Sequence, residues 1–346
     1  MDHARFADRV AREVIDVRRG SDALEGLSQQ GFWAVVSTFE GELTAVRFAN
    51  VDRAPSGARV LPAETKGWPA LDRDWHSSLD RTAYLGAVEA VRERISSGTV
   101  YQVNVCRVLS HVLTEDADLD GLDTLLRQGN PAPHAARIRC DEAGLDIVSA
   151  SPELFLSQRD GRLVTRPIKG TAGTVEGLLP KDYAENVMIV DLMRNDLSGV
   201  CDPGTISVDE LCVVEAHPGL VHLVSTVSGR QRQGADWGHI FAATHPPGSV
   251  SGAPKSSALR TIGDLETSVR GPYCGAVGWV DADAREAELA VGIRTFWAEP
   301  DDAGLRWLRF GTGAGITWQS DPEGEWLETE LKAARLIGLA AGTVTP

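Results

Sequence analysis

Residues 274–310 read CGAVGWVDADAREAELAVGIRTFWAEPDDAGLRWLRF and predict three strands in succession. Runs rich in β-branched and aromatic residues cover 274–281, 287–298 and 305–310, and short polar turns separate them. No segment between them is patterned as a helix. Because parallel strands need a long crossover, this stretch favours a mostly antiparallel α+β architecture over a doubly wound one.

The same patterns extend over the rest of the chain. Further strands are predicted at 100–113, 145–156, 162–168 and 205–229, and helices at 81–97, 181–197, 255–268 and 323–340.

The N-terminal portion is short and differently patterned. Apolar residues at helical spacing predict a helix over 4–19, ended at Gly20, and β-rich runs between 31 and 51 predict a hairpin. The loop-rich segment 52–79 is the one candidate boundary. We expect an N-terminal portion at 1–80, which forms part of the same unit, and a core at 81–340.

Charge and composition exclude several classes of function. The 346 residues contain 34 Lys and Arg against 49 Asp and Glu, a net charge of −15, which argues against nucleic-acid binding. The five cysteines are scattered without a C-x-x-C pair, so neither a disulfide framework nor a structural zinc site is predicted. No apolar run is long enough to cross a bilayer. We expect a cytoplasmic protein without a membrane partner.

A lysine in the stretch RPIKGT, residues 166–171, is the first candidate for chemistry. Lys169 ends an apparent strand and is followed by glycine, which lets another group approach the backbone closely. Burial would disfavour the charged form of this lysine, lower its pKa and supply a nucleophilic amine. An exposed lysine at a turn is the alternative.

Two predicted helices each carry acidic residues three positions apart, and such pairs share a helix face. The pairs are Asp182 with Glu185, and Glu325 with Glu328. If the fold brings them together, they suit a hard cation such as Mg²⁺. For the second helix a solvated surface pair of Glu328 with Lys332 remains the alternative.

Glycines and a proline turn mark two further places. Gly311, Gly313 and Gly315 alternate before the second acidic helix; they either expose amides to a carboxylate or mark a strained strand. They do not form a dinucleotide fingerprint, and PPGSVSGAPK at 246–255 is not a P-loop. Glu153 follows a strand and a proline, and it is either a general acid or a turn residue.

The order of these motifs resembles the chorismate-utilising enzymes, the family of anthranilate synthase component I, aminodeoxychorismate synthase component I, isochorismate synthase and salicylate synthase. The resemblance covers roughly 81–340. It is carried by SGTVYQVNVCR (97–107), SASPELF (149–155), RPIKGTAGT (166–174), KDYAENVMIVDLMRNDLSGVC (181–201), VHLVSTVSG (221–229), PPGSVSGAPK (246–255), RGPYCGAVGW (270–279), AVGIRTF (290–296) and GTGAGITWQSDPEGEWLETELKA (311–333). It implies antiparallel sheets packed as a sandwich with flanking helices.

The resemblance also implies a role for each matching residue. The positions that match Mg²⁺ carboxylates, or support them, are Glu185, Glu328, Asp182 and Glu325. The positions that match substrate-binding residues are Tyr273, Arg294, Gly313, Gly315, His222, Ser249, Thr171 and Lys332. Glu153 matches the general acid that helps the C4 hydroxyl of chorismate to leave.

Two positions choose among the family's reactions. Gln102 stands where the isochorismate and salicylate synthases have a lysine that activates water, and an amide is too weakly basic for that task. Lys169 stands where anthranilate synthases have alanine. The resemblance is therefore closest to aminodeoxychorismate synthase component I, which makes 4-amino-4-deoxychorismate for 4-aminobenzoate and folate synthesis through a covalent lysine adduct at C2.

Partners and alternatives follow from the same resemblance. The chain has no G-x-C-x-G glutaminase elbow, so ammonia is expected from a separate glutamine amidotransferase subunit. Its portion before Arg81 is shorter than the one that carries an aromatic amino-acid site in many relatives. The alternatives are an anthranilate or 2-amino-2-deoxyisochorismate synthase component I, which aminates C2 directly, and a non-catalytic chorismate-binding regulatory subunit.

Overall fold

A computed structural model describes residues 2–53, 67–72, 74–217 and 220–343. The strands are β1 (His3–Arg5), β2 (Arg9–Arg19), β3 (Phe32–Ser37), β4 (Leu43–Arg53), β5 (His76–Ser77), β6 (Gln102–Val112), β7 (His134–Cys140), β8 (Leu145–Ser151), β9 (Leu154–Arg159), β10 (Arg162–Arg166), β11 (Ile168–Ala172), β12 (Ser207–His217), β13 (Leu220–Arg230), β14 (Gly252–Ala253), β15 (Ala276–Asp281), β16 (Glu286–Val291), β17 (Thr295–Pro300) and β18 (Arg306–Ile316). The helices are α1 (Gly20–Leu27), α2 (Arg81–Ser96), α3 (Leu119–Gly129), α4 (Pro180–Ser198), α5 (Trp237–Thr244), α6 (Lys255–Leu265) and α7 (Pro322–Ala340), with short 3₁₀ turns η1 (Val175–Gly177) and η2 (Gly248–Val250).

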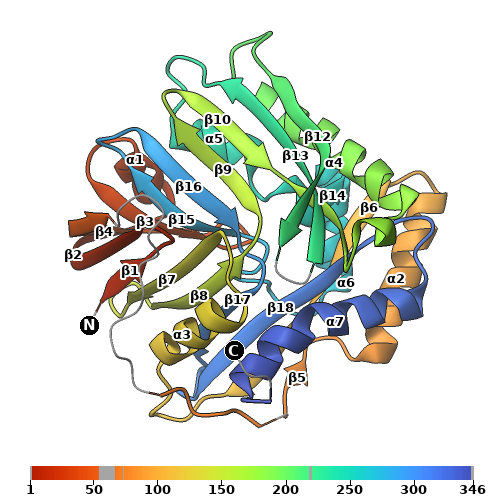
Figure 1. Cartoon of the computed structure of the whole chain (residues 1–346), viewed down its shortest axis with the longest axis horizontal. Helices are drawn as coiled ribbons and strands as arrows, with labels where there is room; N and C mark the ends of the chain where they lie inside the picture. Colours follow the sequence, from red (N-terminus) through yellow and green to blue (C-terminus); the bar gives the residue numbers. More distant parts are fainter. Residues whose placement is uncertain (1, 54–66, 73, 218–219, 344–346) are drawn as a thin grey trace.

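Every strand pairing among the described residues is antiparallel, and the pairings form one continuous order. Neighbours follow as β12, β13, β10, β9, β16, β15, β3, β4, β2, β1, β7, β8, β17, β18 and β6. β11 also pairs with β13, and the short β5 and β14 pair with β6. The predicted antiparallel α+β fold is confirmed. Figure 1 shows that the order curls instead of lying flat. β11 approaches β18, because Lys169 Nζ on β11 lies 3.5 Å from the position that a Cβ on Gly315 of β18 would occupy.

Helices cover the region where the two ends of this order meet. α4 packs on β11, β12 and β13, while α7 lies along β18 with α2 beside it (Figure 1). Both α4 and α7 begin with a proline at the first helical position, where a missing N–H costs nothing. Asp321 accepts a hydrogen bond from the Gly324 amide at 2.8 Å and caps α7. The predicted helices of the core are confirmed.

The predicted N-terminal helix over 4–19 is wrong. These residues form β1 and β2, which pair with each other, and β2 also pairs with β4. The apolar spacing fits a strand because β2 is half-buried and irregular: Glu13 has a φ of 65°, and the register shifts between Val14 and Asp16. Gly20, expected to end a helix, begins α1.

Two of the predicted strands are each two strands in the structure. The predicted strand at 205–229 is the hairpin partners β12 and β13, and the one at 287–298 is β16 and β17. Half of the loop-rich segment 52–79 lies outside the described residues, because 54–66 and 73 are among those not described. The division at residue 80 stays a prediction. Within the described part of the chain, no helix combines the length and apolar character needed to span a membrane.

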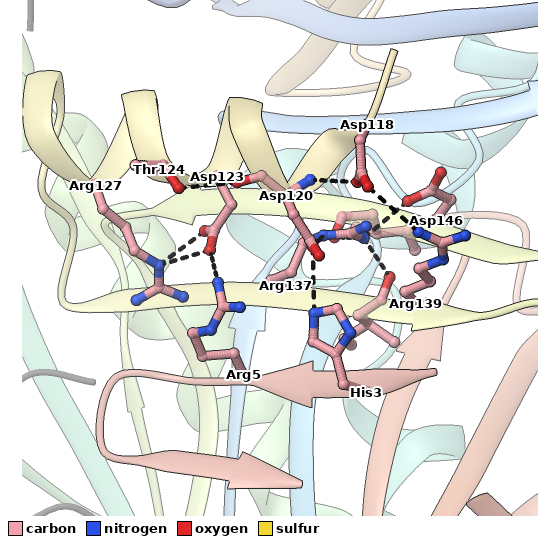
Figure 2. Close-up of polar contacts among 12 residues, drawn as sticks. His3, Arg5, Asp118, Asp120, Asp123, Thr124, Arg127, Arg137, Arg139 and Asp146 are labelled. Atoms are coloured by element: carbon pink, nitrogen blue, oxygen red, sulfur yellow. Dashed lines mark hydrogen bonds and ion pairs between the residues drawn. The ribbon is translucent and has the colours of Figure 1, made fainter. Parts of the chain in front are cut away.

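A network of ion pairs fixes β1 to α3 and to the sheet, as Figure 2 shows. Arg137 is fully buried, with Nε 2.6 Å from Asp120 Oδ1 and Nη1 2.8 Å from Asp146 Oδ1. His3 Nε2 lies 3.2 Å from the same Asp120 oxygen. Burial alone would raise the pKa of Asp120, but the bonds from His3 and Arg137 outweigh it, and the pKa is lowered.

Candidate active site

Lys169 lies on β11, at the place where this strand faces β18. It is half-buried rather than exposed at a turn. Its Nζ is 3.5 Å from the point that a Cβ on Gly315 would occupy. Burial lowers the pKa of Lys169, although the carboxylates of Glu185 and Glu153 act in the opposite direction. The residue therefore has the setting that a nucleophilic amine requires.

Gln102 approaches the same glycine from β6. Its Nε2 lies 2.4 Å from the Cβ position of Gly315, so a side chain at that position would displace the Gln102 amide. The side chain is fully buried, and neither its amide oxygen nor its amide nitrogen has a hydrogen-bond partner among the described residues. Because a buried unpaired amide costs about 1–3 kcal/mol, such a group needs a functional reason.

Glu153 lies between β8 and β9 and is buried. Two hydrogen bonds to Val291 fix the turn that carries Glu153: Val291 N donates to Glu153 O at 3.0 Å, and the Ser151 hydroxyl donates to Val291 O at 2.7 Å. Burial raises the pKa of Glu153 to about 7, although hydrogen bonds from the Ser249 side chain and the Ile168 amide favour the charged form. A carboxyl group with this pKa can donate a proton at neutral pH.

The alternating glycines lie on the regular strand β18, which answers the question left open by the sequence. β17 pairs with β18 only as far as Phe310, so residues beyond it pair with β6 alone. Opposite Gly313, the Cys106 amide donates to Glu266 at 2.9 Å, away from β18. Gly313 and Cys106 therefore form a non-hydrogen-bonded pair, in which the amide of each residue points away from the partner strand. The register therefore points the amides of Gly313 and Gly315 to an edge that no strand pairs with among the described residues.

The acidic residues of α4 and α7 are near enough for their charges to interact, which is the condition that the sequence left open. Burial raises the pKa of Glu185, and Glu328 is among the charges that act on it. Burial also raises the pKa of Glu325. The pKa of Glu328 is lowered: burial opposes this, but Lys332, with Nζ 2.6 Å from Glu328 Oε1, outweighs it. A bound cation would relieve the repulsion within this set.

The fit of these carboxylates to Mg²⁺ can be tested on their present contacts. Asp182 is engaged as a helix cap, because its Oδ2 accepts from the Leu179 amide at 2.8 Å. No group of three or more His, Cys, Asp or Glu side chains arranged to hold a metal occurs in the described ranges. Mg²⁺ commonly uses one or two carboxylates together with water and substrate oxygens. Glu185 and Glu328, one from each helix, fit that pattern.

Arg294 and Tyr273 lie on turns next to the sheet. The Arg294 side chain is half-buried, and no described residue forms an ion pair with it. Burial lowers its pKa. Its φ of 52° is uncommon outside glycine, and such strain concentrates at functional sites. Tyr273 is buried, and its ring packs so closely on Gly311 that a Cβ there would lie 2.0 Å from Cγ.

The remaining predicted substrate-binding residues line the same region. Thr171 Oγ1 lies 2.8 Å from His222 Nδ1, which ties β11 to β13 next to Lys169. Ser249 in η2 is buried and bonds to Glu153. Lys332 donates from Nζ to Gly313 O at 3.0 Å in addition to its contact with Glu328. Contacts and charge interactions thus link one set of residues in the region of β11, β18, α4 and α7: Lys169, Glu153, Ser249, Glu185, Glu328, Lys332 and Gly313. Among the described residues, the Arg294 side chain has no contact that places it in this group.

Sequence reasoning missed two residues that hold this region together. Asn104 Nδ2 donates to Ser249 O at 3.2 Å. Arg270, 1% exposed, donates to Asn104 O and Val250 O and pairs with Glu266. Arg270 and Glu266 bond to the backbone of β6 at Asn104 and Cys106, between the parts of β6 that pair with β14 and with β5. Nothing in the local pattern around Arg270 indicated a buried arginine.

Two surface hollows lie elsewhere on the described part of the molecule. One of 730 Å³ is bordered by β9, β10 and β16, and one of 580 Å³ is bordered by β7, β8 and the start of β18. Neither contains any of the predicted site residues.

A half-buried amine, a carboxyl group whose pKa lies near 7 and an arginine with no acidic partner among the described residues are groups that suit a small anionic molecule. The chain belongs to the chorismate binding enzyme family, whose model matches residues 38–338. The suspected family is confirmed.

Curated relatives divide between two activities. The chain is 38% identical over 274 residues to anthranilate synthase component 1 of Saccharolobus solfataricus, covering 76% of this chain and 63% of the relative. It is 36% identical over 279 residues to aminodeoxychorismate synthase component 1 of Klebsiella aerogenes, covering 77% of this chain and 60% of the relative. The chain thus spans about three-fifths of the length of these relatives.

Solved structures support the fold. A putative 2,3-dihydroxybenzoate-specific isochorismate synthase from Bacillus anthracis superposes with a TM-score of 0.79 at 23% identity, over 98% of this chain and 96% of that one. The agreement over nearly the whole length shows that the antiparallel sheet and its helices are the architecture of chorismate-utilising enzymes.

Proposed function

We propose that the protein converts chorismate and ammonia into 4-amino-4-deoxychorismate and water, with Lys169 as a covalent nucleophile. The observation that carries this proposal is the position of Lys169: its amine lies beside Gln102 at Gly315, and the buried acid Glu153 contacts the amide of the neighbouring Ile168. A nucleophile and a proton donor on one substrate are the two groups that displacement of a hydroxyl requires.

In the first step the Lys169 amine bonds to C2 of chorismate, the ring double bonds shift, and the C4–O bond breaks. Glu153 gives its proton to the departing hydroxyl, which leaves as water. In the second step ammonia bonds to C4, the double bonds shift back, and the C2–N bond to Lys169 breaks. The proton released from nitrogen returns to Glu153, so the enzyme is regenerated and atoms balance.

We assign binding and orientation to groups for which the described part of the chain supplies no partner. Arg294 and the outward amides of Gly313 and Gly315 suit the carboxylates of chorismate, and the unpaired Gln102 amide suits a polar group at the reacting face. Glu185 and Glu328 would hold Mg²⁺. When bound, Mg²⁺ would fix a substrate carboxylate and neutralise its charge.

The choice between products rests on Lys169. Direct amination at C2, as in an anthranilate synthase, gives no role to an amine placed beside the substrate. Water addition lacks a base, because Gln102 has no basic nitrogen. We therefore expect C4 amination, with ammonia supplied by a separate glutamine amidotransferase subunit.

The test is product analysis with purified protein, chorismate, magnesium chloride and an ammonium salt. We expect 4-amino-4-deoxychorismate by mass spectrometry, and we expect Lys169→Met to abolish its formation. Lys181→Met is the matched control: Lys181 is an exposed lysine near the same carboxylates, and its removal should leave the product unchanged.

Anthranilate synthase component I is the second candidate, because a relative with that activity matches at 38% identity. It predicts anthranilate or 2-amino-2-deoxyisochorismate as the product, and full activity in Lys169→Met. Either result would exclude the covalent mechanism.

A further inference from the structure

Arg107 on β6 is a buried arginine whose contacts gather on one helix. It is 3% exposed. Its guanidinium carbon lies 4.1 Å from the centre of the Trp326 ring, its Nε donates to Thr329 Oγ1 at 3.1 Å, and its Nη2 pairs with Glu330. All three partners lie on α7, between Trp326 and Glu330. Only Nη1 turns elsewhere, to Ser77 Oγ at 3.2 Å.

Thr329 is held from two strands at once. It is fully buried, and its carbonyl accepts from Thr312 Oγ1 at 2.8 Å. Thr312 on β18 is the cross-strand partner of Arg107 on β6. The same threonine is therefore held through its hydroxyl by one strand and through its carbonyl by the next. This arrangement fixes both the rotation and the axial position of α7 on the sheet.

The residues around Thr329 are those assigned to the candidate active site. Glu328 precedes it directly, Glu325 lies four positions before it, and Lys332 lies three positions after it. Lys332 donates to Gly313 O, and Gly313 follows Thr312 on β18. A slip of one residue along a helix turns its side chains by about 100° and moves them by about 1.5 Å. Either change would take both carboxylates out of the site.

We infer that Arg107 is a positioning residue, which holds α7 in the register that presents Glu325, Glu328 and Lys332 to Mg²⁺ and substrate. The inference rests on the proposed function for the role of these carboxylates. Arg107 itself touches neither group: it acts through Trp326 and Thr329. Lysine cannot replace it fully, because only the planar guanidinium both stacks on an indole and donates along separate directions.

The test measures Mg²⁺ binding directly, by titration calorimetry with magnesium chloride in the presence of chorismate, well below the melting temperature. Removing a group that orients metal ligands typically weakens binding by about 10–100-fold. We expect a loss in this range for Arg107→Met and a smaller one for Arg107→Lys. Steady-state kinetics should show the same loss as a raised Mg²⁺ requirement.

Arg335→Met is the matched control. Arg335 also docks α7, but near its C-terminal end, where Nε donates to Gly129 O at 2.8 Å. It should lower the melting temperature without changing the Mg²⁺ dissociation constant. If Arg335→Met weakens Mg²⁺ binding as much as Arg107→Met, general loosening of the helix explains the effect, and the inference is wrong.

A double variant separates positioning from stability. Thr329→Val keeps the shape of the side chain and removes the acceptor of the Arg107 Nε bond. If both residues act through one contact, the loss in Mg²⁺ affinity in the double variant is smaller than the sum of the single losses. Equal Mg²⁺ affinity in wild type and Arg107→Met would overturn the inference alone. Absence of Mg²⁺ binding by wild-type protein would overturn the metal assignment as well.

Discussion

Lys332 and Glu328 lie one turn apart on α7, with Nζ 2.6 Å from Oε1, and Lys332 also donates to the carbonyl of Gly313 on β18. The pair is the i, i+4 contact that the sequence left open as a surface feature, and both side chains are about half-exposed. The bond from Lys332 to Gly313 shows that the pair is more than a surface contact, because it connects Glu328 through Lys332 to β18, the strand that carries the amides of Gly313 and Gly315.

Lys332→Met is expected to change function more than stability. Exposed ion pairs contribute about 0.2–1 kcal/mol, so the melting temperature should change little. The ammonium group competes with a cation for Glu328, so its removal should tighten Mg²⁺ binding, while the Michaelis constant for chorismate should rise. Calorimetry and kinetics check the two halves separately, and weaker Mg²⁺ binding would contradict the assignment of Glu328.

Gln102→Met should stabilise the protein or leave its stability unchanged while lowering turnover. The wild-type amide is buried without a partner, and methionine fills the same volume without polar atoms that need one. We expect an equal or higher melting temperature in the absence of chorismate. We also expect a lower kcat/KM, because the amide is assigned to the substrate. A clear loss of stability would show that the amide has a structural partner.

Glu153→Gln should lower the rate by about 10²–10⁴-fold, the usual contribution of a general acid. In the wild type, activity should fall as the pH rises above about 7, because the carboxyl group, whose pKa burial raises to about 7, then loses the proton it must donate. Because Glu153 binds its proton more tightly in the folded state than in the unfolded state, protonation of Glu153 stabilises the folded protein. This contribution is lost as the pH rises from about 4, the pKa of an unperturbed glutamate, to about 7. The variant should therefore gain stability relative to wild type across that range, as measured by urea unfolding.

Gly311→Ala should destabilise the protein and displace Tyr273. The new Cβ would lie 2.0 Å from the tyrosine ring, and overpacking of this kind costs about 1–3 kcal/mol. Gly263→Ala is the matched control: Gly263 lies in α6, and its Cβ would meet no atom within 4 Å. Helix propensity predicts a gain of about 1 kcal/mol there. Similar unfolding free energies for both variants would argue against the close packing.

Asp120→Asn should cost stability at neutral pH and progressively less in acid. The pKa of Asp120 is lowered in the folded state, so its contribution is present above the unfolded value of about 3.9 and is lost as the pH falls below it. The substitution also removes a partner of the buried Arg137 (Figure 2). Urea unfolding at pH 7 and pH 3 should show the difference from wild type shrinking; a constant difference would exclude the ionic contribution.

Local patterns predicted α2, α4, α6 and α7 and many strands of the core, because caps and periodicity are properties of neighbouring residues, but they missed α3, α5 and β7. The beginnings of α4 and α7 follow from Pro180 and Pro322. The same patterns failed at 4–19, where the valines fit either a helix face or a half-buried strand. Pairing with β4 decides between them, and the paired residues are separated by 25 positions (Arg19 with Thr44) to 44 positions (Arg9 with Arg53) in the chain.

The sequence by itself determined the antiparallel α+β class, the family and the chemical types available at the site: an amine at Lys169, a carboxyl group at Glu153 and acidic residues on two helices. Only the tertiary structure decided what those groups become. The pKa of Lys169 falls and that of Glu153 rises because burial removes water from both, and burial depends on β11, β18 and η2 meeting. Arg107 and Thr312 hold α7 across the sheet through contacts between residues distant in the chain, which local sequence does not encode.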